Sequence, residues 1–159
     1  MAYEDAQLMM AVDQDLEGVA VGTVLSEKSL YMGNAGVVPG FSTNTPINDP
    51  GRGTAKRLAI TVSEEFDSAG DDTTMFVELV MADNEELTTN LKVLARTPII
   101  AQEQLKVGYQ FRLSYLPVGI SKKWLGLRFN VGTSVPTAGK IRAGLVESMQ
   151  ENEFVGAQG

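Results

Sequence analysis

Cysteine and histidine are both missing from the 159 residues of this sequence. Their absence excludes disulfide bonds, thiol nucleophiles, zinc sites built from Cys and His, and catalysis by a Ser-His-Asp triad. Long hydrophobic runs are missing too, since no stretch approaches the ~20 apolar residues of a transmembrane helix. The first five residues carry neither the basic nor the apolar region of a secretory signal, so we expect no such signal.

Basic residues are in the minority. The chain has 13 Lys and Arg against 20 Asp and Glu, a net charge of −7, which argues against nucleic-acid binding. The charge is also uneven: residues 1–90 hold 16 acids and 4 bases, whereas residues 91–159 hold 4 acids and 9 bases. This distribution predicts either intramolecular ion pairs between the two parts or a basic face offered to an acidic protein partner.

Apolar residues alternate with a period of two along much of the chain, which indicates strands with one buried face. The length fits one domain, 1–159, and the recurrence of strands without helices between them predicts an all-β, antiparallel sandwich or barrel. One or two helical turns are expected over 82–90. The strands with the clearest alternation are 58–62, 75–81, 109–115 and 125–131, and further strands are expected over 8–12, 19–30, 89–95 and 140–149.

Three segments lack this periodicity or could leave the sandwich. Residues 33–57 form a long loop, in which 33–54 carries five glycines and three prolines, and such loops are usually functional or disordered. Residues 1–16 contain an apolar stretch flanked by acids, which fits either the first strand or an arm that adds to a neighbouring sheet. Residues 150–159 have no pattern and are expected to form a C-terminal tail.

Two short motifs resemble ligand sites but fail in detail. Residues 13–18 begin like a calcium-binding EF-hand loop, yet the twelfth position is Val24 and not glutamate, which favours a solvated acidic turn. Residues 132–140 resemble a phosphate-binding loop, but the spacing is two residues too long and Ile141 replaces the expected Ser or Thr. A wide β-turn between two strands explains this second motif better.

The other polar motifs also favour plain interpretations. Residues 51–57 are basic and glycine-rich, so they could hold an anion, although a mobile loop ending at an edge strand is more common. The acidic pairs at 64–65, 71–72 and 85–86 suit solvated turns and make no evident acid–base dyad. Trp124 faces opposite to Leu125 and Leu127, which predicts either buried packing in a second apolar layer or an interface anchor.

Three segments, in their order and spacing, resemble the capsid cement proteins of tailed bacteriophages, typified by the Bordetella phage cement protein. They are VGYQFRLSYLP at 107–117, KWLGLRFNVGT at 123–133 and TAGKIRAGLVE at 137–147. The opening residues 5–8 and the strand at 58–66, which is followed by a Gly-Asp turn, also resemble that family. The similarity is best over 107–148.

The resemblance implies a jelly-roll-like β-sandwich on the outer surface of a phage head, made in the host bacterial cytoplasm. Such a protein would bridge subunits of the major capsid protein and stabilise the shell against the pressure of packaged DNA. It would be no enzyme and would need no cofactor, nucleic acid or membrane. A homodimer is the expected assembly, and a trimer is the alternative.

Flexible segments that carry aromatic side chains or arginine are the natural places for contacts with the capsid. We expect contacts in 1–16, 33–57 and 151–159. The candidate contact residues are Tyr3, Leu8, Met9, Tyr31, Phe41, Ile47, Arg52 and Phe154.

Two other functions fit a β-sandwich. One is a head–tail connector or tail structural protein. The other is a carbohydrate-binding domain displayed on the virion, which would need an aromatic platform that one Trp and four Tyr barely supply.

Overall fold

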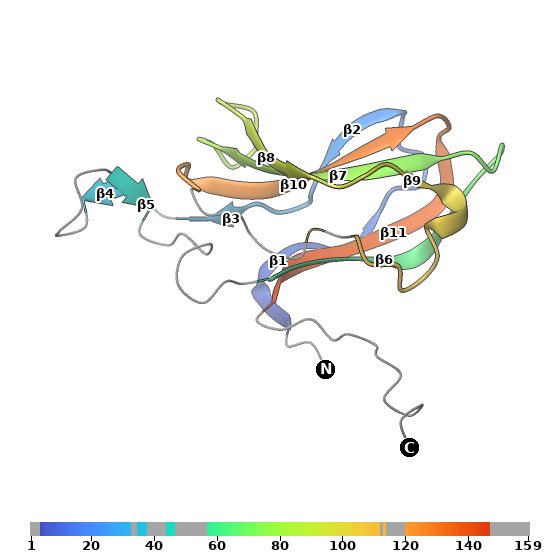
Figure 1. Ribbon diagram of the computed structural model, residues 1–159, viewed down its shortest axis with the longest axis horizontal. Coiled ribbons are helices and arrows are strands. Elements are labelled where there is room, and N and C mark those ends of the chain that lie inside the picture. The colour runs from blue at the N-terminus through green and yellow to red at the C-terminus, as the bar shows by residue number, and fades with distance from the viewer. Residues whose placement is uncertain are drawn as a thin grey trace, which may run out of the picture.

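The protein is an antiparallel β-sandwich, as the sequence predicts, and two sheets face each other across one apolar layer (Figure 1). The computed structural model describes residues 4–32, 35–37, 44–46, 57–111, 113 and 120–146. The helix found in this part is a single 3₁₀ turn, η1 (Gln102–Gln104). No helix among the described residues is long and apolar enough to cross a membrane.

Three strands form the smaller layer and six form the larger one. The smaller sheet has the order β1 (Glu4–Asp15), β11 (Pro136–Val146) and β6 (Arg57–Ser68). The larger has the order β2 (Gly22–Leu25), β10 (Trp124–Gly132), β7 (Thr74–Ala82) and β8 (Lys92–Arg96). In the larger sheet β3 (Leu30–Tyr31) also pairs with β10, and β9 (Ile100–Ala101) also pairs with β7. A separate two-stranded sheet joins β4 (Ala35–Val37) and β5 (Asn44–Pro46).

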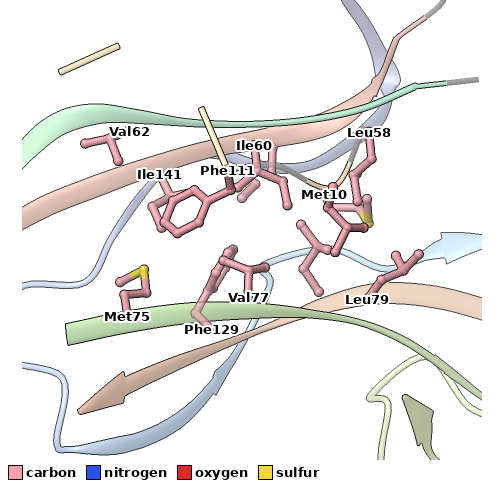
Figure 2. Packing of buried hydrophobic residues seen from close by; sticks show 14 of the residues in the cluster. Met10, Leu58, Ile60, Val62, Met75, Val77, Leu79, Phe111, Phe129 and Ile141 are labelled. Atoms are coloured by element: carbon pink, nitrogen blue, oxygen red, sulfur yellow. The ribbon is translucent and has the colours of Figure 1, made fainter. Parts of the chain in front are cut away.

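The core lies between the two sheets and is built by the predicted alternation. Figure 2 shows Leu58, Ile60 and Val62 of β6 facing Met75 and its neighbours on β7. Each of these side chains is fully buried, because alternate residues of a strand point to the same side of a sheet. The strands predicted over 58–62, 75–81 and 125–131 are therefore confirmed.

The strand predicted over 109–115 is replaced, where it is described, by a single bridge between Thr61 and Gln110. Phe111 is 2% exposed and enters the core as its position in the alternation predicts. Neither Phe111 nor Leu113 belongs to a strand, and Leu113 donates its N–H to the carbonyl oxygen of Phe111 at 3.1 Å.

The helix predicted over 82–90 is wrong, because β7 extends to Ala82 and a loop follows it. The side-chain oxygen of Asn84 accepts hydrogen bonds from the N–H groups of Thr88 and Thr89 at 2.9 and 2.8 Å. Leu87 and Asn90 both have positive φ angles, 54° and 50°, which a right-handed helix cannot contain. Local bonding by Asn84 therefore replaces the helix.

The N-terminal segment is the first strand of the sandwich, which is one of the two interpretations that the sequence left open. Residues 4–15 form β1, which pairs with β11, and Met10 and Leu16 are fully buried. These residues therefore do not form a free arm. Of the long loop at 33–57, the structure describes β4, β5 and Arg57, and the tail at 150–159 lies outside the described residues.

Ion pairs join the acidic first part of the chain to the basic second part. The pairs found among the described residues are Asp13–Arg142, Glu64–Lys140, Glu65–Lys106, Glu78–Arg96, Glu78–Arg128 and Asp83–Lys122. Each links an acid before residue 90 to a base after it. The prediction of intramolecular pairs between the two parts is therefore confirmed.

Candidate interaction surface

A second apolar cluster lies on the outer face of the six-stranded sheet, away from the core. Val80 and Ala82 of β7 are buried there although their strand neighbours already fill the core side. They are covered by Leu87, and Leu25, Leu91 and Trp124 pack around them half-buried. β7 is thus buried on both faces over its second half, which a one-sided alternation does not predict.

Leu87 reaches this face because the loop after β7 folds back over the sheet. A Cβ atom on Gly126 of β10 would lie 2.3 Å from Cδ1 of Leu87, so the leucine occupies the space that the glycine leaves open. The Asn84 hydrogen bonds and the positive φ of Leu87 hold the loop in this position. The loop that covers the outer face is therefore held in place by hydrogen bonds and backbone angles within the loop itself.

An aromatic pair forms the rim of the cluster. Tyr31 of β3 lies opposite Trp124 of β10 in the register of the sheet. The centroids of their rings are 5.1 Å apart and the ring planes are tilted by 51°. Tyr31 is 51% exposed and Trp124 is half-buried. Trp124 therefore belongs to the predicted second apolar layer, and with Tyr31 it leaves aromatic area open to a partner.

We call this region the Trp124 surface. It is made of Leu25, Tyr31, Leu87, Leu91 and Trp124. A hollow of about 310 Å³ adjoins it between the β2–β3 connection and the loop after β7, lined by Leu25, Ser26, Glu27, Lys28, Ser29, Glu85, Glu86 and Leu87. The Ser29 hydroxyl donates to the backbone oxygen of Glu85 at 2.8 Å and ties the two walls together. The hollow thus combines leucines with three carboxylates and one lysine.

The other half of the outer face is charged and internally satisfied. Glu78 of β7 has a side chain 3% exposed, and one of its oxygens accepts a hydrogen bond from Nε of Arg128 at 2.7 Å. Arg96 lies 3.1 Å from the other oxygen, and Asn130 donates to Glu78 at 3.3 Å. Burial opposes ionisation of Glu78, but bonds from Arg128 and Asn130 and the charges of both arginines outweigh it and lower its pKa.

The structure brings few of the predicted contact residues together. Tyr31 is exposed and lies on the Trp124 surface. Met9 is 4% exposed in β1, so its side chain is not offered to a partner and the expectation for it needs correction. Leu8 lies within β1. The candidates outside the described residues are Tyr3, Phe41, Ile47, Arg52 and Phe154.

The motifs that resembled ligand sites have structural roles. Asp15 accepts the N–H of Glu17 in the turn after β1, and Asp13 pairs with Arg142. Residues 133–135 connect β10 to β11 in the other sheet, as the wide-turn interpretation predicts. Among the described residues, no three carboxylates gather into a group able to hold a metal ion.

Comparison of the sequence with models of protein families identifies the family of this chain. Residues 36–145 match the family model of Bbp16, which is more than half of the chain. The chain belongs to the Bbp16 family. Bbp16 is a family of Bordetella phage proteins, so the chain is a phage-related protein, and the family fits a place in the virion. The part of the chain that matches Bbp16 includes Trp124 and Gly126. A search of curated proteins found no match.

Proposed function

We propose that this Bbp16 family member is a capsid cement protein. It binds the outer surface of the phage head, bridges subunits of the major capsid protein and stabilises the shell against internal DNA pressure. The observation that carries the proposal is the Bbp16 match over 36–145, because it links the chain to a phage. In this proposal the chain acts as a homodimer, or a trimer, by contact and not by catalysis, without cofactor, nucleic acid or membrane.

The Trp124 surface supports a role in binding. An exposed tyrosine beside a half-buried tryptophan and half-buried leucines is typical of the residues that anchor protein interfaces. The adjoining hollow adds Glu27, Glu85 and Glu86, which suit a basic side chain on the partner. Each contact is small, but many copies on a symmetric lattice would stabilise the shell together.

Co-sedimentation with phage heads stripped of this protein tests the proposal. We expect saturable binding at a fixed ratio to the major capsid protein, together with a higher temperature of thermal rupture of the heads. Absence of binding would contradict the proposal and point to a connector or tail protein. Binding without a higher rupture temperature would contradict the stabilising role and favour a display function.

A further inference from the structure

The hollow beside the Trp124 surface is formed by the chain itself, because hydrogen bonds fix both of its walls. On one wall, the side chain of Gln14 donates to the oxygen of Leu25 and accepts the N–H of Glu27, each at 2.9 Å. The next residue, Lys28, donates its N–H to the oxygen of Met10 at 3.0 Å. A site whose walls are already fixed loses little conformational entropy when a partner fills it.

The opposite wall belongs to the loop after β7 and is fixed in the same way. The backbone oxygen of Glu85 accepts the hydroxyl of Ser29 at 2.8 Å, and the bonds of Asn84 described above hold the rest of the loop. The second serine of the lining, Ser26, donates its hydroxyl to the oxygen of Lys28 at 2.9 Å. Both serine hydroxyls therefore have partners within the chain, and the groups of the lining that a ligand could still engage are charged.

The carboxylates of the lining have no basic partner within the described part of the chain. Glu27, Glu85 and Glu86 are exposed, and none of them belongs to the ion pairs found among the described residues. Glu86 accepts one hydrogen bond, from the side-chain amide of Asn84 at 3.0 Å. Lys28 lies in the same lining without pairing to any of the three. Three carboxylates and one ammonium group give the hollow an excess of negative charge.

The spread of these carboxylates suits a long cation better than a metal ion. A metal ion needs ligands that converge on one point, and no three acidic side chains among the described residues do so. The hollow measures about 310 Å³. This is about ten times the volume that one water molecule occupies in the liquid, so the side chain of a lysine or arginine fits into it.

Two leucines connect the hollow to the Trp124 surface. Leu25 and Leu87 line the hollow and also belong to the apolar cluster that Trp124 packs against. A basic side chain that enters from this surface crosses the leucines with its methylene groups before its charge reaches the carboxylates. Lysine and arginine commonly lie in this way, with the stem on apolar surface and the charged end in polar surroundings. The aromatic area and the hollow therefore form one continuous docking surface.

We propose that a basic side chain of the major capsid protein occupies this hollow, next to an apolar contact with the Trp124 surface. This inference rests on the proposed function and deepens it by naming the chemistry of the partner, which is a lysine or arginine beside an apolar patch. The excess of carboxylates carries the choice, because it attracts a basic side chain and repels an acidic one. Since salt screens exposed charges, attachment to phage heads should depend on ionic strength.

Binding of the full chain to stripped phage heads at several NaCl concentrations tests the inference. The double variant Glu27→Gln, Glu85→Gln removes one carboxylate from each wall of the hollow. We expect its affinity for heads at low salt to fall about fivefold, as for the loss of exposed ion pairs. The affinity of the double variant should also change less with salt than that of the wild type.

Two further variants sharpen the test. Glu17→Gln combined with Glu103→Gln is the matched control, because both residues are exposed, lie outside the hollow and change the net charge by the same amount. This control should bind heads like the wild type. Lys28→Glu adds a carboxylate to the lining, so its affinity for heads at low salt should rise about twofold. Circular dichroism establishes that each variant is folded.

The inference is overturned, and the proposed function is not, if the wild type binds heads but the double variant matches the control in affinity and salt dependence. Sedimentation velocity without heads adds a second check. If the double variant loses dimers instead of affinity for heads, the hollow holds a second copy of the chain and the inference is wrong. If the wild type binds no heads at any salt concentration, the proposed function fails and the inference fails with it.

Discussion

At the scale of single residues, Glu78 makes the stability of the sandwich depend on pH. Its lowered pKa means that it contributes stability above the unfolded-state value, 4.5, and loses it as the pH falls through the folded-state value below that. We expect Glu78→Gln to lower the free energy of unfolding at pH 7 by about 1–3 kcal/mol, because Arg128 loses a charged partner. The free energy of unfolding of the variant should also fall less steeply than that of the wild type as the pH is lowered.

Denaturant unfolding at a series of pH values checks this prediction. Glu85→Gln is the control, because its carboxylate is exposed and the exchange should change stability by less than about 0.5 kcal/mol. Equal acid sensitivity of the wild type and Glu78→Gln would show that Glu78 does not carry the effect.

Gly139 is a second residue with a decisive local role. Its φ is +143°, and a Cβ atom there would lie 2.5 Å from the ring of Phe66. We expect Gly139→Ala to lower the free energy of unfolding by about 2–4 kcal/mol, since backbone strain adds to overlap with a buried ring. Gly22→Ala isolates the strain, because Gly22 has φ +140° and nothing lies within 4 Å of its Cβ position. Equal losses in both variants would contradict the role of Phe66.

At the scale of elements, the loop after β7 and strand β10 depend on each other. Leu87 occupies the space above Gly126, so Gly126→Ala should displace the loop and cost about 2 kcal/mol. Leu87→Ala removes the clash, and the double variant should be at least about 1 kcal/mol more stable than the sum of the single effects predicts. Denaturant unfolding of the four proteins measures this coupling. A control cycle combines Gly126→Ala with Ile60→Val in the core. In that cycle the losses in the free energy of unfolding should add.

The elements also show what a sequence can predict. Leu58, Ile60 and Val62 were predictable because one face of their strand meets the core and the other does not. Phe111 was placed correctly in the core, but it lies outside any strand, and its carbonyl oxygen accepts a local hydrogen bond from Leu113. The 82–90 helix failed because one side chain, Asn84, satisfies the N–H groups locally.

The candidate site was harder to predict than the strands. Tyr31 could be named as a candidate contact residue from its residue type alone. Trp124 points to the opposite side of its strand from Leu125, and this indicated a second apolar layer. Leu87 could not be found, since its position depends on a loop conformation with positive φ. Met9 was misjudged because a register shift beside it lets consecutive residues, Met9 and Met10, both be buried.

At the scale of the whole molecule, the two ends of the sandwich differ in chemistry. One end carries the Trp124 surface with its open aromatic area. At the other end, the side-chain oxygen of Gln102 accepts hydrogen bonds from the hydroxyl of Ser68 at 2.6 Å and from the N–H of Thr73 at 3.2 Å. If the chain is a capsid cement protein as proposed, we expect capsid contact at the aromatic end, where aromatic area is open to a partner.

Tyr31→Ala tests this asymmetry in the intact chain. Tyr31 is about half exposed, so its loss should change the free energy of unfolding by less than about 1 kcal/mol. Affinity for stripped phage heads should fall about tenfold, as for an aromatic anchor at an interface. Val135→Ala at the other end of β10 is the matched control, because Val135 is 45% exposed and lies away from the aromatic pair. Equal head binding by both variants would place the contact elsewhere, whereas a selective loss with Tyr31→Ala would assign it to the Trp124 surface.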